Sequence, residues 1–184
     1  MIYTTLEKIK AHRPCADGLK KLLRHLGKTD SDDEPLGLDI ILRSNGFENA
    51  LWALRAVEGH DREIRHLACD FAEHVLHVYE RRYPDDSRPR TAIEVSRRYV
   101  DGLATKSELV AAGVAAAAAA DAAAYAAADA AAAAVVWARA AAEGDAERAA
   151  EGAADAAWAA RAATRAGERI WQERRFREWL NDIK

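Results

Sequence analysis

The sequence predicts an all-α fold. A compact multi-helix head over residues 1–103 is followed by a long antiparallel, alanine-rich helical hairpin over residues 104–184 that packs on the head. Three observations support this prediction. Apolar residues recur at helical spacing through the head. No segment shows the alternation and turn residues of a strand. Alanine, the strongest helix former, dominates the chain from Leu109 to Arg169.

The head is expected to contain six helices, which glycine and proline residues separate. The longest of them, over about Asp61–Arg82, carries a continuous apolar stripe and should lie at the centre of the core. In chain order, the expected helices hold Leu6 and Ile9 before Pro14, Leu19–Leu26 before Gly27, Pro35–Leu42 before Asn45 and Gly46, Leu51–Val57 before Gly59, Asp61–Arg82, and Pro89–Val100 before Gly102.

The hairpin is expected to begin at the capping box Thr105-Lys-Ser-Glu108, in which two side chains bind each other's backbone N–H groups. Its first helix should end at Gly144, which forms a turn with Asp145, and its second helix should end near Asn181. So short a turn requires the two helices to run antiparallel. An alanine hairpin buries little apolar area, so we expect a homodimer that pairs the alanine faces.

The composition indicates a cytoplasmic protein. The net charge is −3, and Cys15 and Cys69 lie far apart without the spacing of a metal or redox motif, as in proteins with reduced thiols. The N-terminus carries charged residues where a signal peptide needs an apolar run. Asp121 and Asp129 would lie inside the bilayer if the alanine tract crossed it, so we expect no membrane partner.

The fifth helix carries a candidate metal-binding face opposite its apolar stripe. Imidazole and carboxylate groups at helical spacing can share one face, as a metal site requires. The face also fits a solvated surface, and a metal ion would need further ligands from another segment. The residues concerned are His66, Asp70, His74 and His77.

The sequence gives little support for an enzyme. His60-Asp61 resembles the dyad of metal-dependent phosphohydrolases, but two adjacent residues occur readily by chance. The pair comes after Gly59, where Asp61 fits better as a helix N-cap. The chain contains no phosphate-binding loop, nucleophile elbow, zinc-protease motif or dinucleotide fingerprint. We therefore predict no catalytic residues and no cofactor, and a metal-dependent hydrolase remains an alternative.

Tryptophan and arginine residues of the hairpin are candidates for binding a partner, since both types are enriched at interface hot spots. They also fit two other interpretations. The C-terminal helix could dock on the head through Ile170, Trp171 and Trp179 while its arginines pair with Glu168, Glu173 and Glu178, or it could bind nucleic acid. The candidate contact residues are Trp137, Trp158, Arg161, Arg165, Arg169, Trp171, Arg175 and Trp179.

A set of motifs precedes the alanine-rich tail: Asn49-Ala-Leu-Trp-Ala-Leu-Arg-Ala-Val57, Arg62 to Arg65, Tyr83-Pro-Asp-Asp-Ser-Arg-Pro-Arg90 with Ala92-Ile93, and Asp101-Gly102. Together they resemble the immunity-protein domain of bacterial toxin systems, versions of which occur in phage and mobile-element genomes. Cys15 to Gly27 and Asp33 to Leu36 are similar to the opening segment of small phage-encoded proteins. The resemblance implies an all-helical, non-enzymatic protein that neutralises another protein by binding it, and it identifies no contact residues.

The leading hypothesis is therefore a protein-binding inhibitor, either an immunity protein or a phage counter-defence factor, that blocks a toxin or a nuclease-type defence complex. The first alternative is an architectural protein that binds nucleic acid through the arginines and tryptophans of the C-terminal helix. Its binding would weaken steeply with salt. The second alternative is the metal-dependent hydrolase, whose purified form would contain metal.

Overall fold

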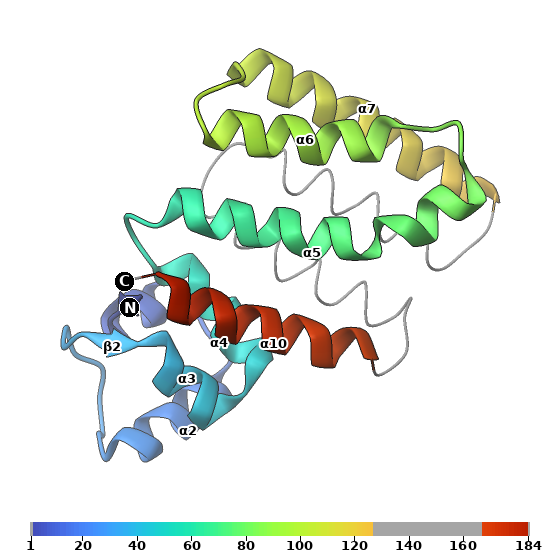
Figure 1. Cartoon of the computed structure of the whole chain (residues 1–184). Helices are drawn as coiled ribbons and strands as arrows, with labels where there is room; N and C mark the ends of the chain where they lie inside the picture. Colours follow the sequence, from blue (N-terminus) through green and yellow to red (C-terminus); the bar gives the residue numbers. More distant parts are fainter. Residues whose placement is uncertain (1, 127–166, 184) are drawn as a thin grey trace. The chain divides into compact units, whose positions relative to one another are not determined.

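A computed structural model describes residues 2–126 and 167–183 (Figure 1). The described residues are mainly helical, which confirms the all-α prediction. The helices are α1 (Leu6–Ala11), α2 (Ala16–Leu26), α3 (Leu38–Asn45), α4 (Phe47–Ala53), the 3-10 helix η1 (Leu54–Ala56), α5 (Asp61–Arg82), α6 (Arg88–Val100), α7 (Lys106–Ala126) and α10 (Gly167–Asp182).

The chain divides into two compact units. Unit 1 comprises Met1–His60 and Glu173–Lys184, and unit 2 comprises Asp61–Gln172. Helix α10 thus contributes its first turns to unit 2 and the rest to unit 1. The predicted turn at Gly144 and Asp145 lies outside the described residues, so the division into head and hairpin stays a prediction.

Local sequence signals set most of the helix boundaries. Helix α2 ends where Gly27 adopts a left-handed conformation with φ of 67°, which costs glycine nothing. Helix α5 spans the expected Asp61–Arg82. Before α7, the Glu108 backbone N–H donates to Thr105 Oγ1 at 3.2 Å, and the Thr105 N–H donates to Glu108 Oε2 at 2.7 Å. The predicted capping box is therefore confirmed.

The structure corrects the expected start of the third helix. Pro35 was expected to open that helix, but Leu36–Gly37 instead form strand β2, which pairs antiparallel with β1 (Tyr3–Thr4). Helix α3 begins only at Leu38. Strands of two residues are too short to show an alternating pattern, so the expectation of a chain without strands was wrong at this point.

The core of unit 1 includes the C-terminal half of α10. Phe176 is fully buried and contacts Phe47 of α4 edge to face, with ring centroids 5.6 Å apart. Trp179, one turn further along α10, is 5% exposed and stacks against Phe176. Aromatic burial of this kind therefore attaches the end of the chain to the N-terminal helices of unit 1.

In unit 2, α6 packs against both α5 and α7 (Figure 1). The buried side of α7 consists of Leu109 followed by small residues, namely Ala112, Ala116 and Ala119. Because alanine side chains are small, they allow the axes of α6 and α7 to approach closely. The opposite side of α7 carries Val110 and Val114, which are exposed.

The turn between α5 and α6 is held by Asp86. Its carboxylate accepts hydrogen bonds from the Tyr79 hydroxyl at 2.6 Å and from Arg88 Nε and Nη2 at 2.8 and 2.6 Å. The hydrogen bonds from Arg88, together with that from Tyr79, hold the pKa of Asp86 well below its ordinary value. Burial, reinforced by the bond to Asp86, raises the pKa of Tyr79.

Across residues 2–126 and 167–183, no helix has both the length and the hydropathy needed to cross a membrane.

Replacing Thr105 with Ala should lower the free energy of unfolding by about 1 kcal/mol, because α7 loses the side-chain cap of its first turn. Chemical denaturation checks this value. Replacing the neighbouring, exposed Lys106 with Ala is the matched control and should change stability by only about 0.5 kcal/mol or less. Equal losses in both variants would contradict a specific role of the cap.

The Asp86→Asn variant should lose about 1–2 kcal/mol of stability at pH 7, because the charged acceptor of four hydrogen bonds is gone. The pKa of Asp86 is lower in the folded state, so its contribution is complete above the ordinary carboxyl pKa and is lost as the pH falls. Unfolding curves from pH 7 to pH 2 should therefore show the difference between wild type and variant shrinking below about pH 4. A constant difference would contradict the assignment.

Replacing Phe176 with Ala should destabilise the protein by about 3–5 kcal/mol, because a fully buried aromatic ring is removed from the core of unit 1. The measurement is urea denaturation followed by circular dichroism. An Arg174→Ala variant changes an exposed residue of the same helix and should stay within about 0.5 kcal/mol of wild type. A small effect of Phe176→Ala would show that α10 is not anchored through this ring.

Candidate functional site

Half of the predicted partner-binding residues belong to the described part of the chain. Arg169, Trp171, Arg175 and Trp179 lie on α10. The other candidates, Trp137, Trp158, Arg161 and Arg165, lie outside the described residues.

Both tryptophans of α10 are engaged within their own units. Trp171 is half-buried in unit 2, where its ring stacks on His74 with centroids 3.6 Å apart and meets Phe71 edge to face at 6.2 Å. Trp179 is buried against Phe176 in unit 1. The structure thus places both rings in the packing of α10, whereas Ile170 is 69% exposed.

The arginines of α10 lie among acidic residues of the same helix. Arg177 Nη2 is 2.7 Å from Glu173 Oε1, and Arg175 approaches Asp182 at 3.9 Å. Gly167–Asp182 contains four arginines and four acidic residues, so the helix has no excess of positive charge to attract a polyanion. These contacts favour the interpretation in which the arginines pair with carboxylates over the one in which they bind nucleic acid.

The histidine face of α5 is divided among different contacts. His66 Nε2 lies 3.2 Å from Asp101, and Asp70 accepts a hydrogen bond of 2.8 Å from Arg97 of α6. His74 Nδ1 lies 2.7 Å from Oε2 of Glu168. Among the residues that the structure describes, no group of three or more His, Cys, Asp or Glu side chains is placed to hold a metal ion.

This face is also less exposed than its polar sequence predicts. Arg97 reaches over it from α6 and binds Glu73 at 2.7 Å as well as Asp70, whose side chain is only 18% exposed. At the end of α6, Arg62 binds Asp101 at 2.7 Å, and this hydrogen bond, with that from His66, lowers the pKa of Asp101. The face is therefore partly covered by α6 and not fully solvated.

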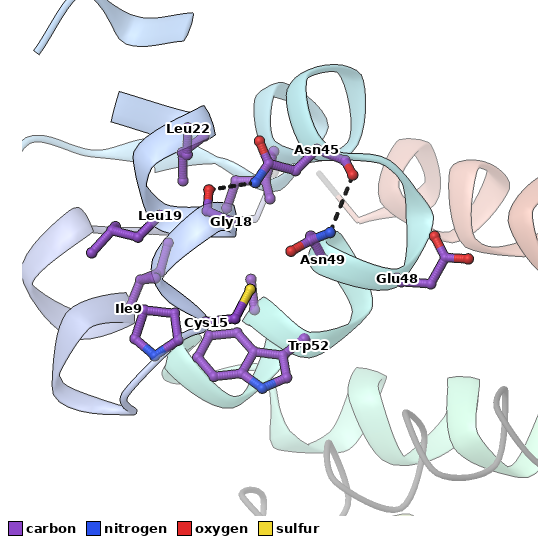
Figure 2. A pocket seen from close by; sticks show the side chains of 12 residues that line it. Ile9, Cys15, Gly18, Leu19, Leu22, Asn45, Glu48, Asn49 and Trp52 are labelled. Carbon is purple, nitrogen blue, oxygen red and sulfur yellow. Dashed lines mark hydrogen bonds between the residues drawn. The ribbon is translucent and has the colours of Figure 1, made fainter. Parts of the chain in front are cut away.

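Unit 1 contains an open cavity of about 240 Å³ that sequence reasoning did not identify. Helices α2, α3 and α4 surround it, and Figure 2 shows its side chains. Its lining is largely apolar, with Pro14 and Cys15 at the start of α2. The apolar walls are formed by Ile9, Leu19, Leu22, Ile41, Trp52 and Ala53.

Polar groups gather at one end of this cavity (Figure 2). Asn45 Nδ2 donates to the Gly18 carbonyl at 2.8 Å, and Asn49 Nδ2 donates to the Asn45 carbonyl at 3.2 Å. These bonds fix both amides, whereas the Glu48 carboxylate is directed away from them (Figure 2). The arrangement resembles a small-ligand site, in which apolar walls surround a few oriented polar groups.

Gly18 allows α2 to lie close to the asparagine side chains of α3 and α4. A Cβ atom at this position would lie 2.8 Å from Cys15 Sγ and 3.0 Å from Asn49 Oδ1. Both distances are shorter than ordinary van der Waals contacts. An isolated glycine inside the apolar pattern of α2 was the sequence signal for a close approach, although it did not identify the partner segments.

The comparisons with known proteins bear on residues 55–180. The family described as Imm-5 like putative immunity protein matches this range, which covers more than half of the chain and runs from η1 to α10. No curated protein and no solved structure matches the chain. The N-terminal motifs from Cys15 to Gly27 and from Asp33 to Leu36 lie before the match, whereas the motifs from Arg62 to Gly102 lie inside it. The chain therefore belongs to the Imm-5 like putative immunity protein family.

Proposed function

We propose that this protein is an immunity-type inhibitor, which neutralises a harmful protein by binding it and catalyses no reaction. The observation that carries the proposal is the family match over residues 55–180. The contacts of α5 are consistent with it, because side chains that could serve acid–base or metal chemistry instead join helices to one another.

The target that we propose is a toxin or a subunit of a nuclease-type defence complex in the bacterial cytoplasm. A toxin would make the chain an immunity protein. A defence complex would make it a phage counter-defence factor. The genes that neighbour its own distinguish these two cases.

The described part of unit 2 offers an apolar surface for such a target. Leu103, Val110 and Val114 are 67%, 53% and 66% exposed, and all three lie inside the family-matched range. Val110 and Val114 are one turn apart on the side of α7 that is opposite its buried residues. Clustered exposed apolar side chains are typical of protein-binding surfaces, whose rims are polar.

Other contacts that we predicted remain part of this proposal. Trp137 and Trp158, with Arg161 and Arg165, are candidate hot-spot residues by composition alone. The predicted homodimer is a competing use of the α7 surface. Sedimentation of the purified protein at micromolar concentration distinguishes a dimer from a monomer.

The test is binding of the purified chain to the toxin or defence protein that the neighbouring genes encode. We expect Val114→Arg to weaken this binding by about tenfold or more, because a charged side chain would enter an apolar contact. Co-expression should show the same loss, since the variant would no longer restore growth to cells that make the target.

The matched control is Thr91→Arg, which adds the same charge at an exposed position on α6. It should bind like wild type, and both variants should keep the wild-type circular dichroism spectrum. Equal binding by both variants would contradict the α7 surface. Failure of the wild-type chain to bind or neutralise any neighbouring gene product would contradict the inhibitor function itself.

A further inference from the structure

We infer that the cavity of unit 1 binds a small, uncharged aromatic molecule that donates a hydrogen bond. The lining residues lie between Ile9 and Ala53, ahead of the family-matched range that begins at Arg55. The site is therefore independent of the function proposed for residues 55–180, and it would be an addition to the activity of the family.

The volume of the cavity sets the size of the ligand. An apolar cavity of about 150 Å³ is large enough to hold benzene. The present cavity of about 240 Å³ accommodates a fused pair of small aromatic rings. Trp52 and Leu19 line it and remain half-exposed, so a ligand would cover apolar surface that is now in contact with water.

The lining favours a ligand without charge. Among the described residues that form it, Glu48 is the only Asp, Glu, Lys, Arg or His. The Glu48 carboxylate is directed away from the asparagine amides of the cavity (Figure 2). A charged ligand would therefore lose its water without meeting an opposite charge, and this loss is costly.

The amide oxygen of Asn49 faces the cavity and is available to a ligand. Asn45 uses both ends of its own amide, because Nδ2 donates to the Gly18 carbonyl at 2.8 Å and Oδ1 accepts from the Ser44 hydroxyl at 2.6 Å. Asn49 Nδ2 donates to the Asn45 carbonyl at 3.2 Å, and Asn49 Oδ1 points toward Gly18 (Figure 2). Within the described part of the chain, no group donates a hydrogen bond to this oxygen.

The hydrogen bond of Asn49 also fixes which end of its amide faces the cavity. Rotation of the amide by half a turn would bring Oδ1 against the Asn45 carbonyl oxygen, and two acceptors cannot pair. The cavity thus presents an oriented acceptor beside apolar walls, which is the usual composition of a small-molecule site. A ligand with one N–H or O–H group would complement it.

Cys15 provides a direct measure of occupancy. Its thiol lines the cavity and is exposed, whereas Cys69, the other cysteine, is fully buried. Burial raises the pKa of Cys69 to about 12, which leaves it almost entirely as the unreactive thiol at neutral pH. Alkylation of the folded protein by iodoacetamide should therefore occur at Cys15 and should slow down when a ligand fills the cavity.

The experiment measures the rate of Cys15 alkylation, by mass spectrometry, in the presence of four probes. Indole and benzofuran have nearly the same shape, but only indole carries an N–H donor. Benzylamine is a cation at neutral pH, and benzoate is an anion. We expect saturating indole to slow alkylation by about fivefold or more, and half-maximal protection should need about fivefold more benzofuran than indole. The two charged probes should give no protection at the concentration at which indole saturates.

Two variants test the role of the Asn49 oxygen. Asn49→Leu keeps the approximate size of the side chain and removes the acceptor, so indole and benzofuran should protect Cys15 equally. Lys20→Leu introduces the same residue at an exposed position of α2 outside the lining, and the preference for indole should be unchanged. Unfolding curves establish that both variants are folded, and the comparison of probes in the wild-type protein does not depend on them.

Four results would overturn the inference. The first is the absence of protection by indole in the wild-type protein. The second is equal protection by indole and benzofuran, which would identify an apolar pocket that does not use the Asn49 oxygen. The third is protection by benzylamine or benzoate as strong as that by indole. The fourth is a preference for indole that persists in a folded Asn49→Leu variant.

Discussion

Burial of α5 over more than one face is the constraint on which unit 2 depends. Ten of its 22 residues are buried, and they include Arg65 and Cys69 as well as the apolar stripe. A helix enclosed in this way cannot leave its polar side chains without partners, because an unpaired buried charge is costly. The Arg97 guanidinium therefore forms an ion pair with the Asp70 carboxylate, and the Arg65 guanidinium lies over the ring of Tyr99.

How far the sequence could predict the fold depended on how local the signal for each element is. The boundaries of α5 and the cap of α7 depend on residues within a few positions, so local patterns were sufficient for both. The pairing of Tyr3–Thr4 with Leu36–Gly37 depends on segments far apart in the sequence, and two residues carry no periodic signal. The burial of Arg65 could not be predicted, because an arginine on a helix is normally assigned to the surface.

The candidate sites show a similar division. Composition identified the histidines and tryptophans as unusual, but it could not say that His74 would stack on Trp171 and bind Glu168, which lie far along the chain. The cavity of unit 1 requires three helices to meet at Gly18, and none of those helices alone contains a recognisable motif. Sites that are assembled from distant segments need the tertiary structure before their chemistry can be assessed.

The contact between Phe47 and Phe176 has a consequence for the order of folding. Unit 1 combines residues 1–60 with residues 173–184, so its core stays incomplete until α10 has been synthesised and has left the ribosome. Closing such a long loop costs entropy and slows folding. The apolar surface around Phe47 therefore stays uncovered until α10 is made, and the nascent chain has to avoid aggregation up to that point.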